Sequence, residues 1–167
     1  MRKKWKSILE GSSYLVLIVL CTFLLYQHLA DAPPTDPQGL TVGETYEALQ
    51  AVVPAGAESA WLLALNPNCS YCDESMSFYQ TLLQTLRQKN DRAAFVAVVA
   101  HPDFIAGETA TLIANGVAVD TVVKLDFKAA ELSAVPAIIQ VDRDGKVNHF
   151  WRGYLNEARQ AEVLQLL

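Results

Sequence analysis

Apolar and polar positions divide the chain into two parts of different character. No formally charged residue occurs over residues 11–30, and residues 14–26, YLVLIVLCTFLLY, form a dense apolar run. A helix rises about 1.5 Å per residue, so 20 such residues cover roughly 30 Å, the thickness of the hydrocarbon core of a bilayer. Because the segment is apolar on all sides, it predicts a transmembrane helix over 11–30 rather than a helix buried in a globular core.

Beyond this segment, apolar runs alternate with stretches of helical spacing. Continuous apolar runs, typical of strands buried on both faces, occur at residues 60–65 and 94–100. Shorter strands are predicted at residues 40–42, 117–123, 137–141 and 147–151, the last two joined by the turn sequence DRDGK. Apolar residues three and four positions apart predict helices at residues 44–53, from Cys69 to Leu86, at 104–114 and at 156–167.

The order of these elements predicts an α/β fold. Strands that alternate with helices imply a sheet that is parallel in part, and the closing hairpin makes the sheet mixed. We therefore expect a mixed sheet flanked by helices over residues 40–167. Residues 31–39, DAPPTDPQG, contain three prolines and predict a semi-rigid linker between the transmembrane helix and this domain.

Charge predicts which side of the membrane the domain occupies. Residues 1–10 carry four Lys and Arg residues, and positive flanks stay on the cytoplasmic side, so the N-terminus is expected inside and the domain outside the cytoplasm, in the periplasm of a Gram-negative cell. A cleaved signal peptide is the alternative, because Ala30-Asp31-Ala32 has the small-x-small form of a cleavage site. Pro33 directly after that site fits cleavage poorly, so we expect an uncleaved anchor.

The part of the chain after residue 30 is acidic. It contains 9 Lys and Arg against 17 Asp and Glu, a formal charge of −8. Such a charge argues against nucleic acid as a partner and against docking on anionic lipid.

Two cysteines, Cys69 and Cys72, stand between a predicted strand and a predicted helix, in the sequence LNPNCSYCDESMSFY. Residues three apart in the first turn of a helix share a face, so the two sulfurs can meet. The free N–H groups of that turn lower the pKa of the leading thiol, and Asn68 is the expected N-cap. Cys69 is therefore the candidate attacking thiol and Cys72 the resolving thiol. Cys21 lies in the apolar segment and is assigned no function.

A metal site and a static staple are the alternatives for this pair. One C-x-x-C supplies two ligands, whereas structural zinc takes four, and the three histidines, His28, His101 and His149, are scattered along the chain. A bridge across three residues closes almost no chain entropy and would stabilise the fold little. A redox couple is favoured, with no metal and no cofactor expected. Outside the cytoplasm, such a couple can persist in its oxidised state.

A second motif follows in SAVPAIIQVDRDGKV, where Pro136 precedes a predicted strand. Proline cannot donate a hydrogen bond within a sheet, so it belongs at a strand start or a bulge. A C-x-x-C that opens a long helix, a V-P before a strand that ends D-x-D-G-K-V, and a W-x-G after it resemble the thioredoxin superfamily. The resemblance is strongest to its membrane-anchored TlpA/ResA type, and it covers about residues 40–167.

The resemblance implies a fold, a site and partners. Pro136 would be cis and lie next to the cysteine pair, and the backbone of Val135 would pair with a bound substrate strand. Together with Ser70 and Tyr71, between the cysteines, these residues would bind substrate. The expected partners are proteins that contain cysteines, and a membrane protein that exchanges electrons with the domain.

The sequence also departs from the pattern of the superfamily. Asn68 replaces a frequent Trp before the first cysteine, and Leu63 occupies the place of a buried acid that serves proton transfer to the resolving thiol in many thioredoxins. Ala137 follows Pro136, whereas relatives in cytochrome maturation tend to have Gly-x-Pro-Glu-Thr. Asp73 and Glu74 follow the pair without a nearby cation, so only a moderate lowering of the Cys69 pKa is expected.

Together these features predict a membrane-anchored, extracytoplasmic thiol–disulfide oxidoreductase, with the resemblance favouring a reductase. A non-catalytic thioredoxin-like subunit of a membrane complex and a copper-handling protein are the alternatives.

Overall fold

The computed structural model describes residues 39–89 and 92–167. The predicted cytoplasmic segment 1–10, the predicted transmembrane helix 11–30 and all but the last residue of the predicted linker lie outside these ranges. In the part of the chain that is described, no helix combines the length and the apolar character needed to cross a membrane.

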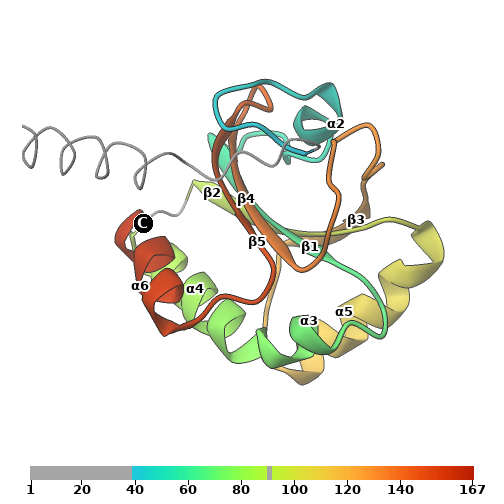
Figure 1. Cartoon of the computed structure of the whole chain (residues 1–167), viewed down its shortest axis with the longest axis vertical. Helices are drawn as coiled ribbons and strands as arrows, with labels where there is room; N and C mark the ends of the chain where they lie inside the picture. Colours follow the sequence, from blue (N-terminus) through green and yellow to red (C-terminus); the bar gives the residue numbers. More distant parts are fainter. Residues whose placement is uncertain (1–38, 90–91) are drawn as a thin grey trace, which may run out of the picture. The chain divides into compact units, whose positions relative to one another are not determined.

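A mixed sheet forms the centre of the domain (Figure 1). Among the described residues it has five strands in the order β3-β2-β1-β4-β5. The strands are β1 (Ser59–Leu65), β2 (Ala93–Val99), β3 (Thr121–Lys124), β4 (Ala137–Asp142) and β5 (Val147–Arg152). The first three are parallel, and β4 runs antiparallel to both β1 and β5. The predicted fold class, a partly parallel sheet closed by a hairpin, is confirmed.

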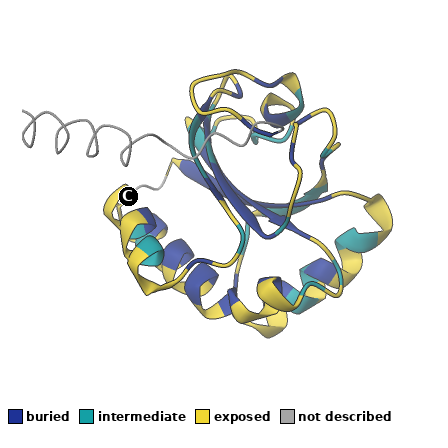
Figure 2. Cartoon of the chain, viewed as in Figure 1, coloured by how far each residue is buried: buried dark blue, intermediate teal, exposed yellow. Residues whose placement is uncertain are grey.

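Alternate side chains of the central strand enter two separate cores, as a strand buried on both faces requires. Trp61, Leu63 and Leu65 belong to one apolar cluster, and Leu62 and Ala64 to the other. The first cluster packs under the helices α4 (Met76–Lys89), α5 (Ile105–Ala114) and α6 (Glu157–Gln165). The short helix α2 (Glu47–Gln50) covers the other face, and Figure 2 shows the strands buried between these layers.

The segment before α2 differs from the prediction. Residues 40–42 form no strand, and the helix expected over 44–53 is limited to Glu47–Gln50. The reason is that the backbone of the segment pairs with the β4–β5 hairpin: Gly43 N donates to Val147 O at 2.7 Å, and Tyr46 N donates to Gly145 O at 3.1 Å. These long-range hydrogen bonds, with the isolated bridge between Thr45 and Lys146, hold the backbone at Thr45 and Tyr46 extended, so the helix begins at Glu47, three residues after its predicted start.

The helix that follows the cysteine pair is interrupted. The single helix predicted from Cys69 is divided into α3 (Ser70–Glu74) and α4, with Ser75 between them. The Ser75 hydroxyl donates to the Tyr71 carbonyl at 2.7 Å, a local bond of the kind that often bends helices. The remaining helices begin and end close to their predicted limits, and a turn of 3₁₀ helix, η1 (Pro102–Phe104), leads into α5.

Candidate active site: a disulfide at the end of the central strand

The cysteine pair lies where the central strand ends. β1 stops at Leu65, residues 66–68 form a short turn, and Cys69 and Cys72 follow at the start of α3. The two residues are joined in a disulfide, with their Cα atoms 5.2 Å apart. The predicted meeting of the two sulfurs is confirmed.

The cap of α3 is not the predicted residue. Asn68 has a φ of +61°, in the left-handed region that asparagine adopts more readily than most residues, and it does not cap the helix. Cys69 is the N-cap instead: its sulfur accepts the backbone N–H of Cys72 at 3.2 Å, and its carbonyl accepts the same N–H at 2.9 Å. The N–H donated directly to Cys69 Sγ favours a negative charge on that sulfur.

The two sulfurs differ in access to solvent. Cys72 is 2% exposed and packs within the core under α4, whereas Cys69 is half-buried and Ser70 and Tyr71 are exposed. A substrate can therefore reach the first cysteine from outside, while the second can react with little except its neighbour.

Pro136 lies at the same end of the sheet. The Val135–Pro136 peptide bond is cis, as the resemblance implied. Ala137, the first residue of β4, pairs with Ala64, so Pro136 lies beside the end of β1, where the chain turns toward Cys69. Pro136 itself is buried, whereas Val135 is half-buried.

A third loop, which follows β5, completes this end of the sheet. Gly153 N donates to the Pro136 carbonyl at 2.7 Å, and the next residue, Tyr154, places its ring 6.3 Å from that of Tyr71, measured between centroids. Both rings are exposed, Tyr71 by 57% and Tyr154 by 47%. The sequence analysis did not single out Tyr154, although it directly follows the W-x-G motif.

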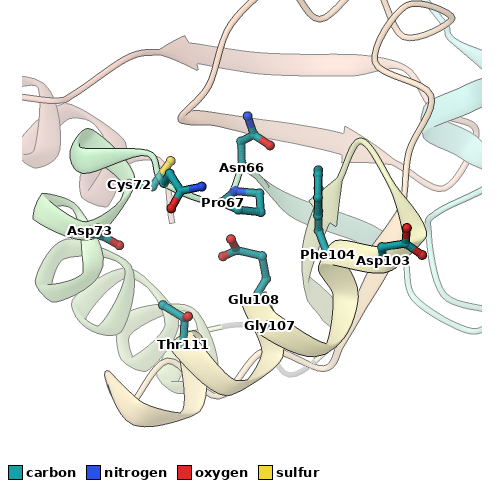
Figure 3. Close-up of a pocket in the computed structure, with 10 residues that line it drawn as sticks. Asn66, Pro67, Cys72, Asp73, Asp103, Phe104, Gly107, Glu108 and Thr111 are labelled. Atoms are coloured by element: carbon teal, nitrogen blue, oxygen red, sulfur yellow. The ribbon is translucent and has the colours of Figure 1, made fainter.

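A cleft of about 370 Å³ opens between the cysteine loop and α5 (Figure 3). The turn before Cys69, α3, η1 and α5 contribute its walls, formed by Asn66, Pro67, Asn68, Cys72, Asp73, Asp103, Phe104, Gly107, Glu108 and Thr111. Three of these residues are acidic, and none is Lys or Arg. The interior of this cleft is therefore polar and negatively charged.

Glu108 is the buried acid of this cleft. It is 7% exposed, and its carboxyl group points into the cleft toward Pro67 (Figure 3). Burial, and then the negative charge of Asp73, raise the pKa of Glu108 above its usual range. The sequence analysis missed this residue, although its position four residues before the buried Leu112 places it on the inner face of the predicted helix.

No group of three or more His, Cys, Asp or Glu residues with the geometry of a metal site occurs within residues 39–89 and 92–167. His101 pairs with Asp103 on the surface at 3.2 Å, and His149 stacks on Trp151 with ring centroids 5.5 Å apart.

The chain was compared with known proteins. No protein-family model and no curated protein matches it. Solved structures do match. A candidate protein disulfide isomerase from Bacteroides thetaiotaomicron has a TM-score of 0.56 at 18% identity, with 76% of this chain and 88% of that chain covered. An uncharacterised thioredoxin-like protein from Porphyromonas gingivalis has a TM-score of 0.55 at 20% identity, with 74% and 91% covered.

A third similar structure is a thiol:disulfide interchange protein from a Bacteroides species, with a TM-score of 0.53, 14% identity and coverage of 76% of this chain and 88% of that chain. At these identities the likeness concerns the fold. The domain has a thioredoxin-like fold, and the resemblance noted from the sequence motifs is confirmed at that level.

Proposed function

We propose that the protein is a thiol–disulfide oxidoreductase that exchanges disulfides with other proteins. The observation that carries the proposal is the asymmetric cysteine pair. Cys69 is accessible and its sulfur accepts a backbone N–H, and it is bonded to the buried Cys72, beside the cis Val135–Pro136 bond. The similar structures include a candidate protein disulfide isomerase and a thiol:disulfide interchange protein, and these names support the proposal.

The exchange proceeds in two steps. In the reducing direction, the Cys69 thiolate attacks one sulfur of a substrate disulfide, which forms a mixed disulfide and releases the other substrate sulfur as a thiolate. Cys72 then loses its proton and attacks Cys69 Sγ, which forms the Cys69–Cys72 bond and releases the second substrate thiolate. Two electrons pass from the cysteine pair to the substrate. The reverse sequence oxidises a substrate dithiol.

The substrate is proposed to bind over the loops that meet at this end of the sheet. Val135 and Pro136 supply one side of the groove, and Ser70 and Tyr71 supply the other. Val135 is half-buried, so part of this residue remains accessible to an extended polypeptide.

The location of the domain is a further part of the proposal. The uncharged segment 11–30, with the basic segment before it, supports a membrane anchor and an extracytoplasmic domain. A reductase in that place must receive electrons from a membrane partner, since each turnover leaves Cys69 and Cys72 oxidised. The reducing direction itself rests on the resemblance to the TlpA/ResA type.

Single cysteine variants of the full-length chain in detergent test the exchange. Cys72→Ser should accumulate mixed disulfides with substrate proteins, because nothing resolves them, and Cys69→Ser should form none and lose turnover. Cys21→Ser is the matched control and should behave like the wild type. The products are separated on non-reducing gels and identified by mass spectrometry.

The reverse pattern, with mixed disulfides only on Cys69→Ser, would exchange the two roles. Full turnover in both variants would favour the non-catalytic subunit, and a stoichiometric copper ion lost with Cys69 would favour the copper-handling protein.

A further inference from the structure

The cleft beside the disulfide combines apolar and acidic walls. Pro67, in the turn after β1, and Phe104, in η1, contribute apolar surface. Asp73 and Glu108 contribute carboxyl groups from α3 and α5 (Figure 3). Cys72 lines the same cleft, which therefore begins at the disulfide. Its volume of about 370 Å³ lies within the range of pockets that hold small ligands, so it has room for one long side chain.

Glu108 directs a carboxyl group into this cleft. The residue is 7% exposed, and the carboxyl group points into the cleft (Figure 3). Among the described residues, no hydrogen bond or ion pair joins this carboxyl group to another side chain or to the backbone. Within the same ranges, no fully enclosed side-chain oxygen lacks a partner, so the carboxyl group meets the open space of the cleft. A ligand in the cleft can reach it there.

The charges around this space are of one sign. Burial, and then the negative charge of Asp73, raise the pKa of Glu108, so the two carboxylates repel each other across the cleft. Asp103, the third acid of the lining, pairs with His101 at the surface, and no Lys or Arg lines the cleft. A positively charged group between α3 and α5 would relieve this repulsion.

A lysine or arginine side chain suits both walls. Such side chains bury their apolar stems along apolar surface, here that of Pro67 and Phe104, while the charged head group reaches polar partners. The head group would donate charge-assisted hydrogen bonds to the carboxylates. A metal ion suits the cleft less well, since residues 39–89 and 92–167 contain no group of three or more His, Cys, Asp or Glu with the geometry of a metal site.

We propose that this cleft is a substrate subsite for a lysine or arginine side chain, so that the protein prefers polypeptides in which a basic residue lies near the reactive cysteine. The inference rests on the exchange function proposed above and adds a substrate class to it. Glu108 and Asp73 are the residues that determine the preference. The formal charge of −8 on the chain after residue 30 attracts basic polypeptides over longer distances as well.

Matched peptides test the subsite. Each peptide contains one cysteine, activated with dithiodipyridine, a neutral chromogenic disulfide, and Lys, Gln or Glu two positions before or two positions after it. Reduced full-length protein in detergent releases the coloured thione, and the second-order rate constant is measured at roughly 0.15 M salt, where exposed charges are largely screened. For one of the two positions, the Lys peptide should react about tenfold faster than the Gln peptide, the factor expected of one charge-assisted hydrogen bond. The Glu peptide should be the slowest.

Neutral variants locate the source of this preference. Glu108→Gln should reduce the preference for Lys over Gln to about twofold, the part that the longer-range field supplies. Asp73→Asn should reduce it as well. Glu74→Gln is the matched control, because Glu74 is an exposed acid on the same helix that does not line the cleft, and it should keep the preference. The ratio of two peptides is compared because a change in the reactivity of Cys69 affects both equally.

Equal rates of the wild type with the Lys and Gln peptides would overturn the subsite. The same loss of preference in Glu74→Gln as in Glu108→Gln would also overturn it, since a general negative field would then be sufficient. Calcium that binds the wild type and not Glu108→Gln in calorimetry would assign the cleft to a metal ion instead. A wild type that releases thione from no peptide would contradict the exchange function itself.

Thermal unfolding of each oxidised variant shows whether it is folded. If Glu108→Gln does not fold, Asp73→Asn and Glu74→Gln decide the question, since the two residues are neighbours on α3 and only Asp73 lines the cleft. An equal preference in these two variants would again overturn the subsite.

Discussion

Among the individual side chains around the disulfide, the exposed ring of Tyr154 has the clearest consequence for the proposed function. Its ring and that of Tyr71 remain exposed on two loops that flank the redox pair. Exposed tyrosines are enriched where proteins bind other proteins, because a large rigid ring is desolvated there with little loss of conformational entropy. The Gly153 to Pro136 hydrogen bond fixes the loop, so the Tyr154 ring is held beside the proposed groove.

Tyr154→Ala should weaken exchange with a protein substrate and spare exchange with a small one. We expect kcat/KM for the reduction of insulin to fall about tenfold, as for an interface residue worth more than 1 kcal/mol. The rate with dithiodipyridine should not change, since that molecule is too small to need the ring. The control is Ile113→Ala, which also removes an exposed apolar side chain, but from α5 and not from the loop after β5. Equal losses with both substrates would indicate damage to the site instead.

At the scale of the element, helix α4 carries a buried phenol group, the side chain of Tyr79, that affects the pH dependence of stability. Tyr79 is 2% exposed, and burial raises its pKa to about 12, although a hydrogen bond with Ser75 opposes the shift. In the unfolded chain the phenol ionises near pH 10, while in the folded chain it stays protonated until about pH 12. The unfolded state is therefore favoured progressively as the pH rises between these two values.

Tyr79→Phe should remove this alkaline loss of stability. The wild type should lose about 2 to 3 kcal/mol of unfolding free energy through this one group between pH 10 and pH 12, and the variant should not. Near neutral pH the variant should be less stable by about 1 kcal/mol, the usual value of one hydrogen bond. Urea unfolding of the oxidised protein at both pH values measures the difference, with the exposed Tyr154→Phe as control. Parallel losses in wild type and Tyr79→Phe would contradict the assignment.

The elements also show how far local sequence patterns extend. The strands around Trp61 and Phe95 were predictable because each is one apolar run. The cysteine pair was predictable because two cysteines three positions apart at a helix start can meet, and Pro136 because it directly precedes a strand. The pairing of Gly43 and Tyr46 with the β4–β5 hairpin, the cap at Cys69 and the buried position of Glu108 were not predicted. Each depends on a contact or a backbone angle that only the folded chain fixes, such as the bonds from Gly43 and Tyr46 to the β4–β5 hairpin.

The whole molecule is proposed to combine this domain with a membrane anchor. Full-length protein expressed in bacterial cells should remain in the membrane fraction after alkaline extraction and keep its original N-terminus, because the segment 11–30 is long enough to span a bilayer. A chain that lacks residues 1–30 is the control and should leave that fraction. Intact mass and N-terminal sequencing decide the outcome: a mature chain that begins near Pro33 would show that the segment is a signal peptide.

The acidic lining of the cleft also affects which small thiols in solution reach the disulfide. Asp73, Asp103 and Glu108 bring negative charge to the wall beside Cys72, and the chain after residue 30 carries a formal charge of −8. Glutathione and similar small thiols are anions at neutral pH, so the field of the domain lowers their concentration near the disulfide and slows their encounter with it. Under the proposed function, such a site would be partly insulated from the redox buffer around it, and the oxidation state of its cysteines would follow the proteins that dock on it.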